Sequence, residues 1–262
     1  MPNALYDTIG KTYNSTRAAD PYLAGRVHAL LQPASAGTYL DIGCGTGNYT
    51  RALHAMGTRF IGMDPSDTML IRARELSTSI EWKQGTAENT QLNNTSVDGI
   101  TAFLTIHHWK NITDGFREMH RVMKGDGNFV LFTSTPEQMK TYWLNHYFPN
   151  MMNTSMAIMP TIEGIHRAFS HTGWTITATE PYDVKPDLQD LFLQSGKYQP
   201  ERYFDETFRK GISSFSAFSH AEEVKKGLEL LRSDIDSGKF EAVRKSHVCE
   251  VGEYLFVVAR KG

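Results

Sequence analysis

One glycine-rich stretch, residues 39–50 (YLDIGCGTGNYT), constrains the fold more than any other part of this sequence. An apolar run ends at Asp41-Ile42, three glycines then alternate with small residues, and a helical pattern begins near Asn48. This order predicts a strand, a tight loop and a helix. Glycines allow positive φ and a close approach of the backbone to a ligand. The free N–H groups at the start of the following helix add a polar, slightly positive surface.

The spacing of the glycines distinguishes two classes of ligand. A dinucleotide fingerprint, G-x-G-x-x-G, would require glycine at position 48 or 50, where the chain has Asn48 and Thr50. The observed pattern is D-x-G-x-G-x-G, and it resembles the class I S-adenosylmethionine-dependent methyltransferases. A glycine-rich turn without a ligand is the alternative. The resemblance implies that the cofactor contacts Asp41, Gly43, Cys44, Gly45 and Gly47.

Composition narrows the setting. The 262 residues include 40% apolar ones and carry a net charge of −2, with Lys and Arg scattered rather than grouped in a basic stripe, so we expect no nucleic-acid partner. Two distant cysteines predict no disulfide framework and fit a reducing cytoplasm. The N-terminus does not resemble a signal peptide, and the longest apolar run, 254–259, is too short to cross a bilayer. We therefore expect a cytoplasmic protein without a membrane partner; its oligomeric state stays open.

Strands and helices alternate along the first half of the chain. Apolar runs predict strands at 59–63, 80–84, 97–106 and 128–133, each followed by a helical or loop segment. Such alternation indicates an α/β fold with a mostly parallel sheet, whose ligands bind beyond the carboxyl ends of the strands. The resemblance implies a Rossmann-like, seven-stranded sheet with helices on both faces, a helical lid inserted before the last strand, and an antiparallel last strand.

A second acid, Asp64, ends the second predicted strand 17 residues after Gly47, the right distance for one crossover helix. A carboxylate there can accept hydrogen bonds from both ribose hydroxyls. The alternative is that Asp64 only caps the next helix. In the family, the stretch like 64–70 also supplies an apolar wall for the adenine, which implies contacts from Pro65 and Met69.

The segment after the third predicted strand, 85–88, resembles the Gly-Asp-Ala-Glu segment that borders the adenine in the family. This chain departs from it at Thr86, whose hydroxyl can accept a hydrogen bond but carries no charge. The resemblance implies that the N–H group of Ala87 contacts the ring. Glu88 is expected to hold the loop.

The N-terminal 20 residues contain Tyr6, Tyr13 and Arg17 in a pattern that resembles the segment covering the cofactor in many small-molecule methyltransferases. The resemblance implies that both tyrosines face the cationic sulfonium and act in catalysis, and that Tyr13 also contacts the cofactor. It implies that Arg17 pairs with the cofactor carboxylate. The alternative is a tail with surface tyrosines. Asp20-Pro21 predicts the start of the next helix.

The fourth predicted strand ends in Thr105-Ile106-His107-His108. Strand alternation lets one histidine of the pair face the predicted crevice, and we favour His107 as a general base because a free imidazole titrates near pH 6.5. The equal alternative is that both histidines are loop residues that shape the wall of the cofactor site. Thr105 is also expected to contact the cofactor. No metal site is expected, because no further ligand lies at a suitable spacing.

These patterns divide the chain into an N-terminal flap (1–20), a cofactor-binding core (21–136), a partial lid with the sixth strand (137–185), a helical lid insertion (186–247) and the final strand (248–262). The insertion carries many phenylalanines and tyrosines, and its stretch 202–215 resembles bacterial methyltransferases assigned to natural-product pathways. The insertion predicts a mostly apolar or aromatic acceptor, although ordinary core packing explains many of these aromatic residues.

The resemblance implies an enzyme that transfers the methyl group of S-adenosylmethionine to a small molecule by in-line displacement, leaving S-adenosylhomocysteine. Two alternatives stay open. An RNA or protein methyltransferase is disfavoured, because the chain lacks a basic surface and an Asn-Pro-Pro-Tyr-type tetrapeptide after the fourth strand. A protein of the same fold that binds the cofactor without methyl transfer, or uses it for other chemistry such as cyclisation, would share the same loops.

Overall fold

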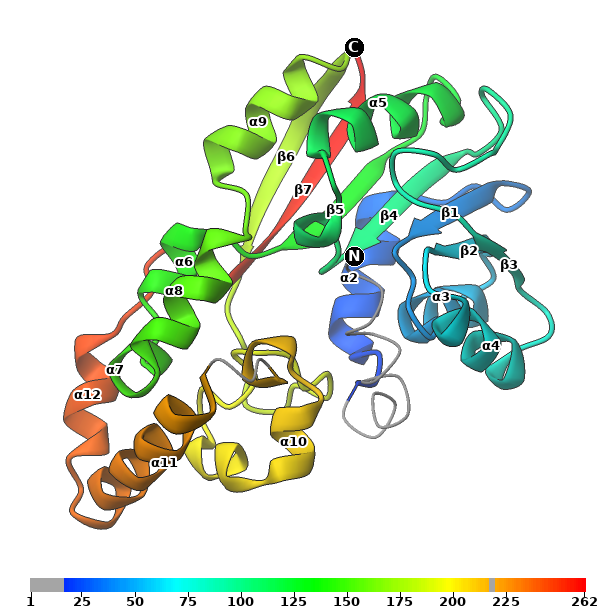
Figure 1. Ribbon diagram of the computed structural model, residues 1–262. Helices are drawn as coiled ribbons and strands as arrows, with labels where there is room; N and C mark the ends of the chain where they lie inside the picture. Colours follow the sequence, from blue (N-terminus) through cyan, green and yellow to red (C-terminus); the bar gives the residue numbers. More distant parts are fainter. Residues whose placement is uncertain (1–16, 217–219) are drawn as a thin grey trace.

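The computed structural model describes residues 17–216 and 220–262, and its centre is a seven-stranded sheet in the order β3-β2-β1-β4-β5-β7-β6 (Figure 1). Strands β1 to β5 are parallel, and β7 runs antiparallel to both of its neighbours. The strands are β1 (Thr38–Ile42), β2 (Arg59–Asp64), β3 (Glu81–Gln84), β4 (Gly99–Phe103), β5 (Phe129–Thr133), β6 (Trp174–Tyr182) and β7 (Tyr254–Lys261). The predicted mostly parallel α/β sheet, with an antiparallel last strand, is confirmed.

The central strands read as continuous apolar runs because both faces of the sheet are covered. All five residues of β5 are buried. Phe129 and Leu131 belong to one core cluster, whereas Val130 and Phe132 belong to a second cluster on the opposite face. The alternation of side chains along a strand therefore produces two separate cores.

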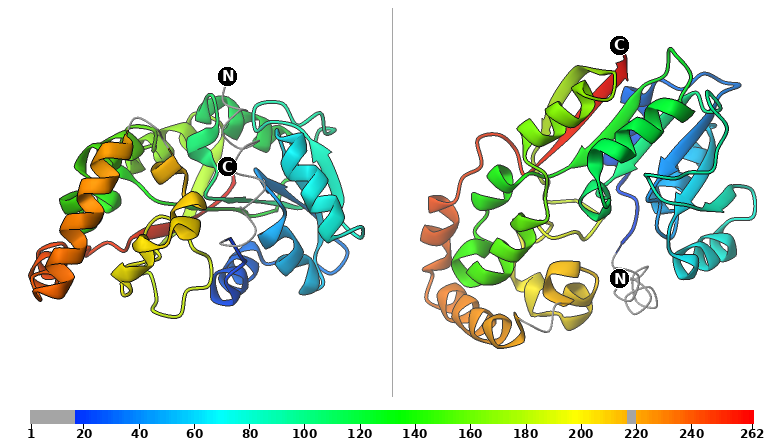
Figure 2. Two further views of the ribbon diagram at one scale, coloured as in Figure 1. Left: turned by 60° about the horizontal axis from the view of Figure 1, so that its bottom comes forward. Right: turned by 45° about the horizontal axis from the view of Figure 1, so that its top comes forward.

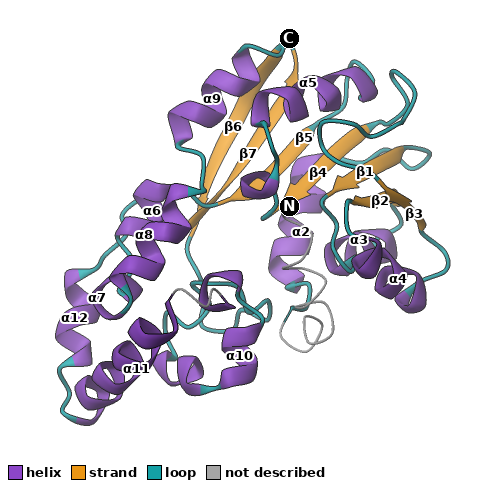
Figure 3. Ribbon diagram, in the orientation of Figure 1, coloured by secondary structure: helices purple, strands orange, loops and turns teal. Residues whose placement is uncertain are grey.

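Helices cover both faces of the sheet (Figure 3). Helices α5 (Ile112–Val122) and α9 (Ile162–Ser170) pack on the first core, and α2 (Pro21–Leu31) and α3 (Asn48–Ala55) on the second. Helix α4 (Asp67–Leu76) packs near the β3 edge against Trp82. As predicted, α2 begins with Asp20 as its N-cap, whose side chain accepts a hydrogen bond from the Leu23 N–H, and with Pro21 in its first turn.

A third core lies in a layer of short helices beside the sheet (Figure 2). Trp143 packs edge-on against Tyr203 and Phe240, with ring centroids 5.4 and 5.0 Å away. We call this layer the helical unit. Two separate segments of the chain form it. The first segment contains α6 (Pro136–Lys140), α7 (Leu144–Tyr147) and α8 (Pro149–Ala157), before β6. The second, between β6 and β7, contains η3 (Pro200–Phe204), α10 (Glu206–Lys210), η4 (Ser213–Ser216), α11 (Ala221–Asp236) and α12 (Phe240–Ser246).

The fourth predicted strand, 97–106, differs most from the observed one. Strand β4 ends at Phe103 rather than at 106, because Leu104 takes a left-handed φ of 49° and residues Ile106–His108 form a short 3₁₀ turn, η2. Strand β6 lies within the segment predicted to hold the sixth strand, and it pairs with β7 along its length to Tyr182. No helix in the two described ranges combines the length and apolar character needed to cross a bilayer.

Candidate functional site

The glycine loop joins β1 to α3 at the carboxyl end of the sheet. Gly43, Gly45 and Gly47 all have positive φ, at 72°, 56° and 77°. A Cβ at Gly43 would overlap the Thr105 side chain, and one at Gly47 would overlap the Trp82 ring, so these two glycines are required by internal packing. A Cβ at Gly45 would meet nothing within 4 Å. Gly45 is therefore the glycine of the three whose Cα faces open space.

Asp64 lies opposite this loop, at the end of β2. Its Oδ2 accepts a hydrogen bond from the Gly45 N–H at 2.9 Å, and its Oδ1 accepts one from the Ser66 N–H at 2.9 Å. Burial raises the pKa of Asp64, and the two amide hydrogen bonds oppose this effect. Ser66, not Asp64, caps α4 through its side chain. Because a carboxylate oxygen has two lone pairs, each oxygen keeps capacity for one further donor.

These two groups border a cavity of about 710 Å³. It brings together nearly all of the predicted cofactor-binding residues that the structure describes. Lining the cavity are Arg17, Asp41, Gly43, Cys44, Gly45, Asp64, Pro65, Met69, Thr86, Ala87, Glu88, Thr105 and His107. Gly47 does not line it and instead packs against Trp82. Tyr6 and Tyr13 lie outside the described residues.

Asp41 contacts other protein groups rather than presenting a free carboxylate. It accepts hydrogen bonds from the hydroxyls of Thr50, at 2.5 Å, and Thr101, at 3.0 Å. Burial raises the pKa of Asp41 to about 6, against the opposing effect of these two hydrogen bonds. Its carboxylate therefore fixes β1, α3 and β4 relative to one another at the floor of the cavity.

The predicted adenine-edge loop follows β3. Thr86 forms a two-way backbone hydrogen-bond pair with Asn89, at 3.2 Å in each direction, which closes a tight turn around Ala87 and Glu88. Glu88 Oε1 accepts hydrogen bonds from the N–H groups of Lys110, at 2.7 Å, and Asn111, at 3.2 Å. Glu88 thus ties this loop to the residues that precede α5.

Arg17 has a protein partner that sequence reasoning missed. Its Nε and Nη2 donate to Oδ1 and Oδ2 of Asp190, at 2.5 and 3.2 Å. Asp190 is 1% exposed, lines the same cavity, and also accepts a hydrogen bond from the Tyr49 hydroxyl at 3.2 Å. No motif identifies Asp190, because its partners lie 141 and 173 residues away.

His107 stands in the turn η2, and its ring lies 3.9 Å from that of His108 between centroids. Its Nδ1 is buried and has no hydrogen-bond partner among residues 17–216 and 220–262. Burial holds the pKa of His107 well below 6.5, and the nearby His108 and Arg17 lower this pKa further. The imidazole is therefore neutral at physiological pH.

His107 also lines a second, smaller cavity of about 110 Å³, between the sheet and the helical unit. Arg17, Leu104, His108 and Ile158 border both cavities as well. The rest of the smaller cavity has polar and apolar walls. Its polar lining residues include Ser134, Ser155, Gln194, Ser213 and Ser214. Its apolar walls include Met139, Met159, Phe192, Leu193 and Ile212. A compound in this cavity would therefore lie beside one in the larger cavity.

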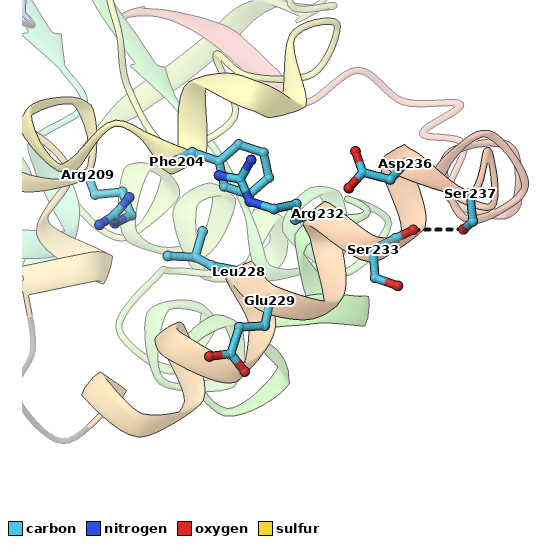
Figure 4. Close-up of a pocket in the computed structure, with 8 residues that line it drawn as sticks. All are labelled: Phe204, Arg209, Leu228, Glu229, Arg232, Ser233, Asp236 and Ser237. Carbon is cyan, nitrogen blue, oxygen red and sulfur yellow. Dashed lines mark hydrogen bonds between the residues drawn. The ribbon is translucent and has the colours of Figure 1, made fainter.

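A separate hollow of about 690 Å³ lies on the helical unit (Figure 4). The guanidinium of Arg232 lies 4.0 Å from the centroid of the Phe204 ring, above a wall formed by Leu228. This hollow shares no lining residue with the two cavities at the strand ends. It therefore has no part in the predicted site.

Comparisons with known proteins agree with this geometry. A family model described as "Methyltransferase domain" matches residues 40–131. A solved structure, described as a methyltransferase from an antibiotic biosynthesis pathway of Anabaena variabilis, is 33% identical, with a TM-score of 0.82; the match covers 93% of this chain and 98% of that one.

Two bacterial proteins with methyltransferase names are also similar in sequence. A demethylmenaquinone methyltransferase of Chlorobaculum tepidum is 27% identical over 186 residues, which are 66% of this chain and 70% of that protein. A malonyl-[acyl-carrier protein] O-methyltransferase of Erwinia pyrifoliae is 26% identical over 193 residues, or 72% and 73% of the two chains.

Proposed function

The chain belongs to the class I S-adenosylmethionine-dependent methyltransferases, and from this premise we propose that it methylates a small, mostly apolar or aromatic metabolite held in the smaller cavity. The observation that carries this proposal is the position of His107, which lines both cavities. A methyl donor in the larger cavity and an acceptor in the smaller one would be neighbours there.

The residues of the larger cavity fit the cofactor. The open space above Gly45 admits a ligand against the backbone, and Asp64 retains acceptor capacity for the ribose hydroxyls. Pro65 and Met69 offer an apolar wall for the adenine, next to the turn of Ala87. A volume of about 710 Å³ lies within the usual range for a small-ligand site. When bound, the cofactor supplies a methyl group activated by a sulfonium.

The protein would then act mainly by positioning. Alignment of two bound reactants removes as much as ~7–11 kcal/mol of the barrier in ideal cases. The neutral Nδ1 or Nε2 of His107 can accept a proton from an acceptor hydroxyl at the junction of the cavities. The helical unit closes the side of the smaller cavity opposite the sheet, so we assign it the role of the predicted lid, which keeps water from the reacting groups.

The names of the relatives indicate different acceptors. That of the Chlorobaculum protein indicates demethylmenaquinone, and that of the Erwinia protein a malonyl group carried on acyl-carrier protein. The description of the Anabaena structure supports a place in natural-product biosynthesis. We also propose a cytoplasmic location, which the two free cysteines fit.

The test combines binding and transfer. Calorimetry should give micromolar-range affinity for S-adenosylhomocysteine and no binding of nicotinamide dinucleotides. Asp64→Asn should weaken binding by about tenfold or more, because it removes the ionised ribose acceptor. S-adenosylmethionine with a labelled methyl group is then incubated with panels of small phenols, carboxylates and amines. Transfer to at least one phenol is expected; cofactor binding without transfer to any member would contradict the proposed acceptor class.

A further inference from the structure

The side-chain amide of Gln194 is buried beside the smaller cavity and makes no hydrogen bond within the described residues. Gln194 lines this cavity, and the residue is 0% exposed. In the described part of the chain, neither its side-chain Nε2 nor its Oε1 has a hydrogen-bond partner. Buried amides are normally paired on both atoms, because an unmet donor or acceptor retains the full cost of losing water.

The backbone around Gln194 is fixed by three tyrosine hydroxyls. Tyr254 accepts a hydrogen bond from the Gln194 N–H at 3.4 Å, and Tyr142 donates to the Gln194 carbonyl at 3.2 Å. Tyr203 donates to the preceding Leu193 carbonyl at 2.5 Å and also contacts the Tyr142 hydroxyl at 3.0 Å. The side chain is therefore held at the cavity by ordered surroundings, and its amide is not satisfied by a neighbouring turn.

The cavity around this amide combines apolar side chains with serine hydroxyls. Phe192 and Ile212 line the same cavity, whose volume of about 110 Å³ suits a single ring with short substituents. His107 brings a second buried, unpartnered polar atom to the same space. Two buried polar groups that lack partners in the described residues and border one small cavity are the arrangement expected where a bound molecule completes the hydrogen bonds.

We propose that Gln194 is a specificity-determining residue, which recognises an oxygen substituent of a single-ring acceptor, while the reacting hydroxyl of that acceptor faces His107. The amide can donate to a carbonyl or hydroxyl oxygen and can accept from a hydroxyl. The proposal rests on the proposed function, since it assumes that the smaller cavity holds the acceptor. It adds a chemical requirement: the ring carries an oxygen substituent besides the reacting hydroxyl.

The first test needs no substrate. Gln194→Leu replaces the amide by an apolar group of similar size, and Gln199→Leu is the matched control on an exposed glutamine five residues away. If the amide is unpaired in the free protein, Gln194→Leu should keep or raise the melting temperature relative to both wild type and control. A lower melting temperature in Gln194→Leu alone would overturn the proposal, because it would show that the amide already has partners in the protein.

The second test compares two probes of nearly equal shape, 4′-hydroxyacetophenone and 4-ethylphenol, which differ by one carbonyl oxygen. Binding is measured by calorimetry on protein saturated with S-adenosylhomocysteine. Wild type and Gln199→Leu should bind the ketone at least tenfold more tightly than the ethylphenol, and Gln194→Leu should lose this preference. Equal preference in wild type and Gln194→Leu, or no binding of either probe to wild type, would overturn the proposal.

Different results would reject the proposed function and the proposed role of Gln194. If S-adenosylhomocysteine does not bind at all, the proposed function fails. If it binds, and other acceptors are methylated while the phenol probes show no dependence on Gln194, the proposed function stands and the role of Gln194 is rejected.

Discussion

Arg17 and Asp190 form a two-point ion pair that joins the N-terminal segment to the connection after β6, 173 residues further along the chain. The Arg17 side chain is 15% exposed and that of Asp190 is 1% exposed, so the pair is largely shielded from water. Both residues line the larger cavity, so the ion pair holds two distant segments of the chain together at the cavity wall.

Removing one member of this pair should cost more than removing both. Arg17→Met leaves the Asp190 carboxylate buried without its cationic partner, with only the Tyr49 hydroxyl donating to it, so we expect a loss of about 3–5 kcal/mol in the free energy of unfolding. Arg17→Met/Asp190→Leu should recover part of this loss. Urea unfolding of the single and double variants measures the coupling. Additive losses would show that the ion pair does not contribute as a unit.

The same variants separate two roles of Arg17. If its guanidinium also contacts the cofactor carboxylate, as the sequence predicts, Arg17→Met should weaken S-adenosylhomocysteine binding about tenfold or more. Asp190→Asn, which keeps the arginine, should bind nearly as well as wild type. Equal losses in both variants would show that the pair acts only by shaping the cavity.

The open space beside Gly45 predicts that a methyl group there would block the cofactor, and Gly57 provides a control position. Gly45→Ala and Gly57→Ala place a methyl group at a positive φ, 56° and 91°, with nothing within 4 Å in either case. The backbone strain should therefore be similar, about 1 kcal/mol or more in each variant. Gly57 does not line the cavity. Calorimetry should show at least a tenfold loss of cofactor affinity for Gly45→Ala and none for Gly57→Ala.

Asp41 makes a pH-dependent contribution to stability. Its pKa is about 6 in the folded protein against an ordinary 3.8, so folding favours its protonated form. This contribution is present below pH 4 and is lost as the pH rises through 6, by an amount on the order of 3 kcal/mol. Urea unfolding at pH 4 and 7.5 should show Asp41→Asn gaining stability relative to wild type at the higher pH. A difference that does not change with pH would contradict the raised pKa.

The contribution of His107 to stability changes with pH in the opposite direction to that of Asp41. Its pKa is held well below 6.5, so its contribution to stability is present above pH 6.5 and is lost as the pH falls below that value. His107→Gln should therefore lose less stability than wild type between pH 7 and 5, and His166→Gln, an exposed control on α9, should behave as wild type. Thermal unfolding across this range makes the comparison.

Activity gives a second reading of His107. Turnover should stay level from pH 8 to pH 6, because the imidazole remains neutral throughout. His107→Ala should lower turnover by ~10²–10⁴ while cofactor affinity stays near that of wild type. If cofactor affinity falls in parallel with turnover, His107 is a wall of the cofactor cavity rather than a base.

Sequence reasoning worked where the information is local. The strand, loop and helix around the glycine loop, the end of the second strand at Asp64 and the cap at Asp20 each follow from residues close by in the sequence, and the alternating strands and helices indicated the mostly parallel sheet. The contacts of these residues with the cofactor stay predictions. The positions that sequence reasoning missed depend on distant contacts. Asp190 contacts Arg17 across 173 residues of sequence, and Gln194 stands out only because its buried amide lacks partners in the described residues.

The prediction also treated the three glycines of the loop as equivalent, although glycine is needed at these positions for different physical reasons. Gly43 and Gly47 are needed because Thr105 and Trp82 fill the space where a side chain would lie, and these neighbours come from other strands and loops. The core of the helical unit was unpredictable for a related reason. Trp143 contacts rings that follow about 60 and 97 residues later, and helical periodicity carries no information about such pairs.

The position of β7 has a consequence for synthesis on the ribosome. This strand lies between β5 and β6, yet it follows both of them in the sequence, at residues 254–261. Until it emerges, β5 presents an unpaired edge in a growing sheet, and such edges recruit other chains. The sheet is therefore complete only after β7 has been synthesised, when the strands that border the larger cavity have already been translated.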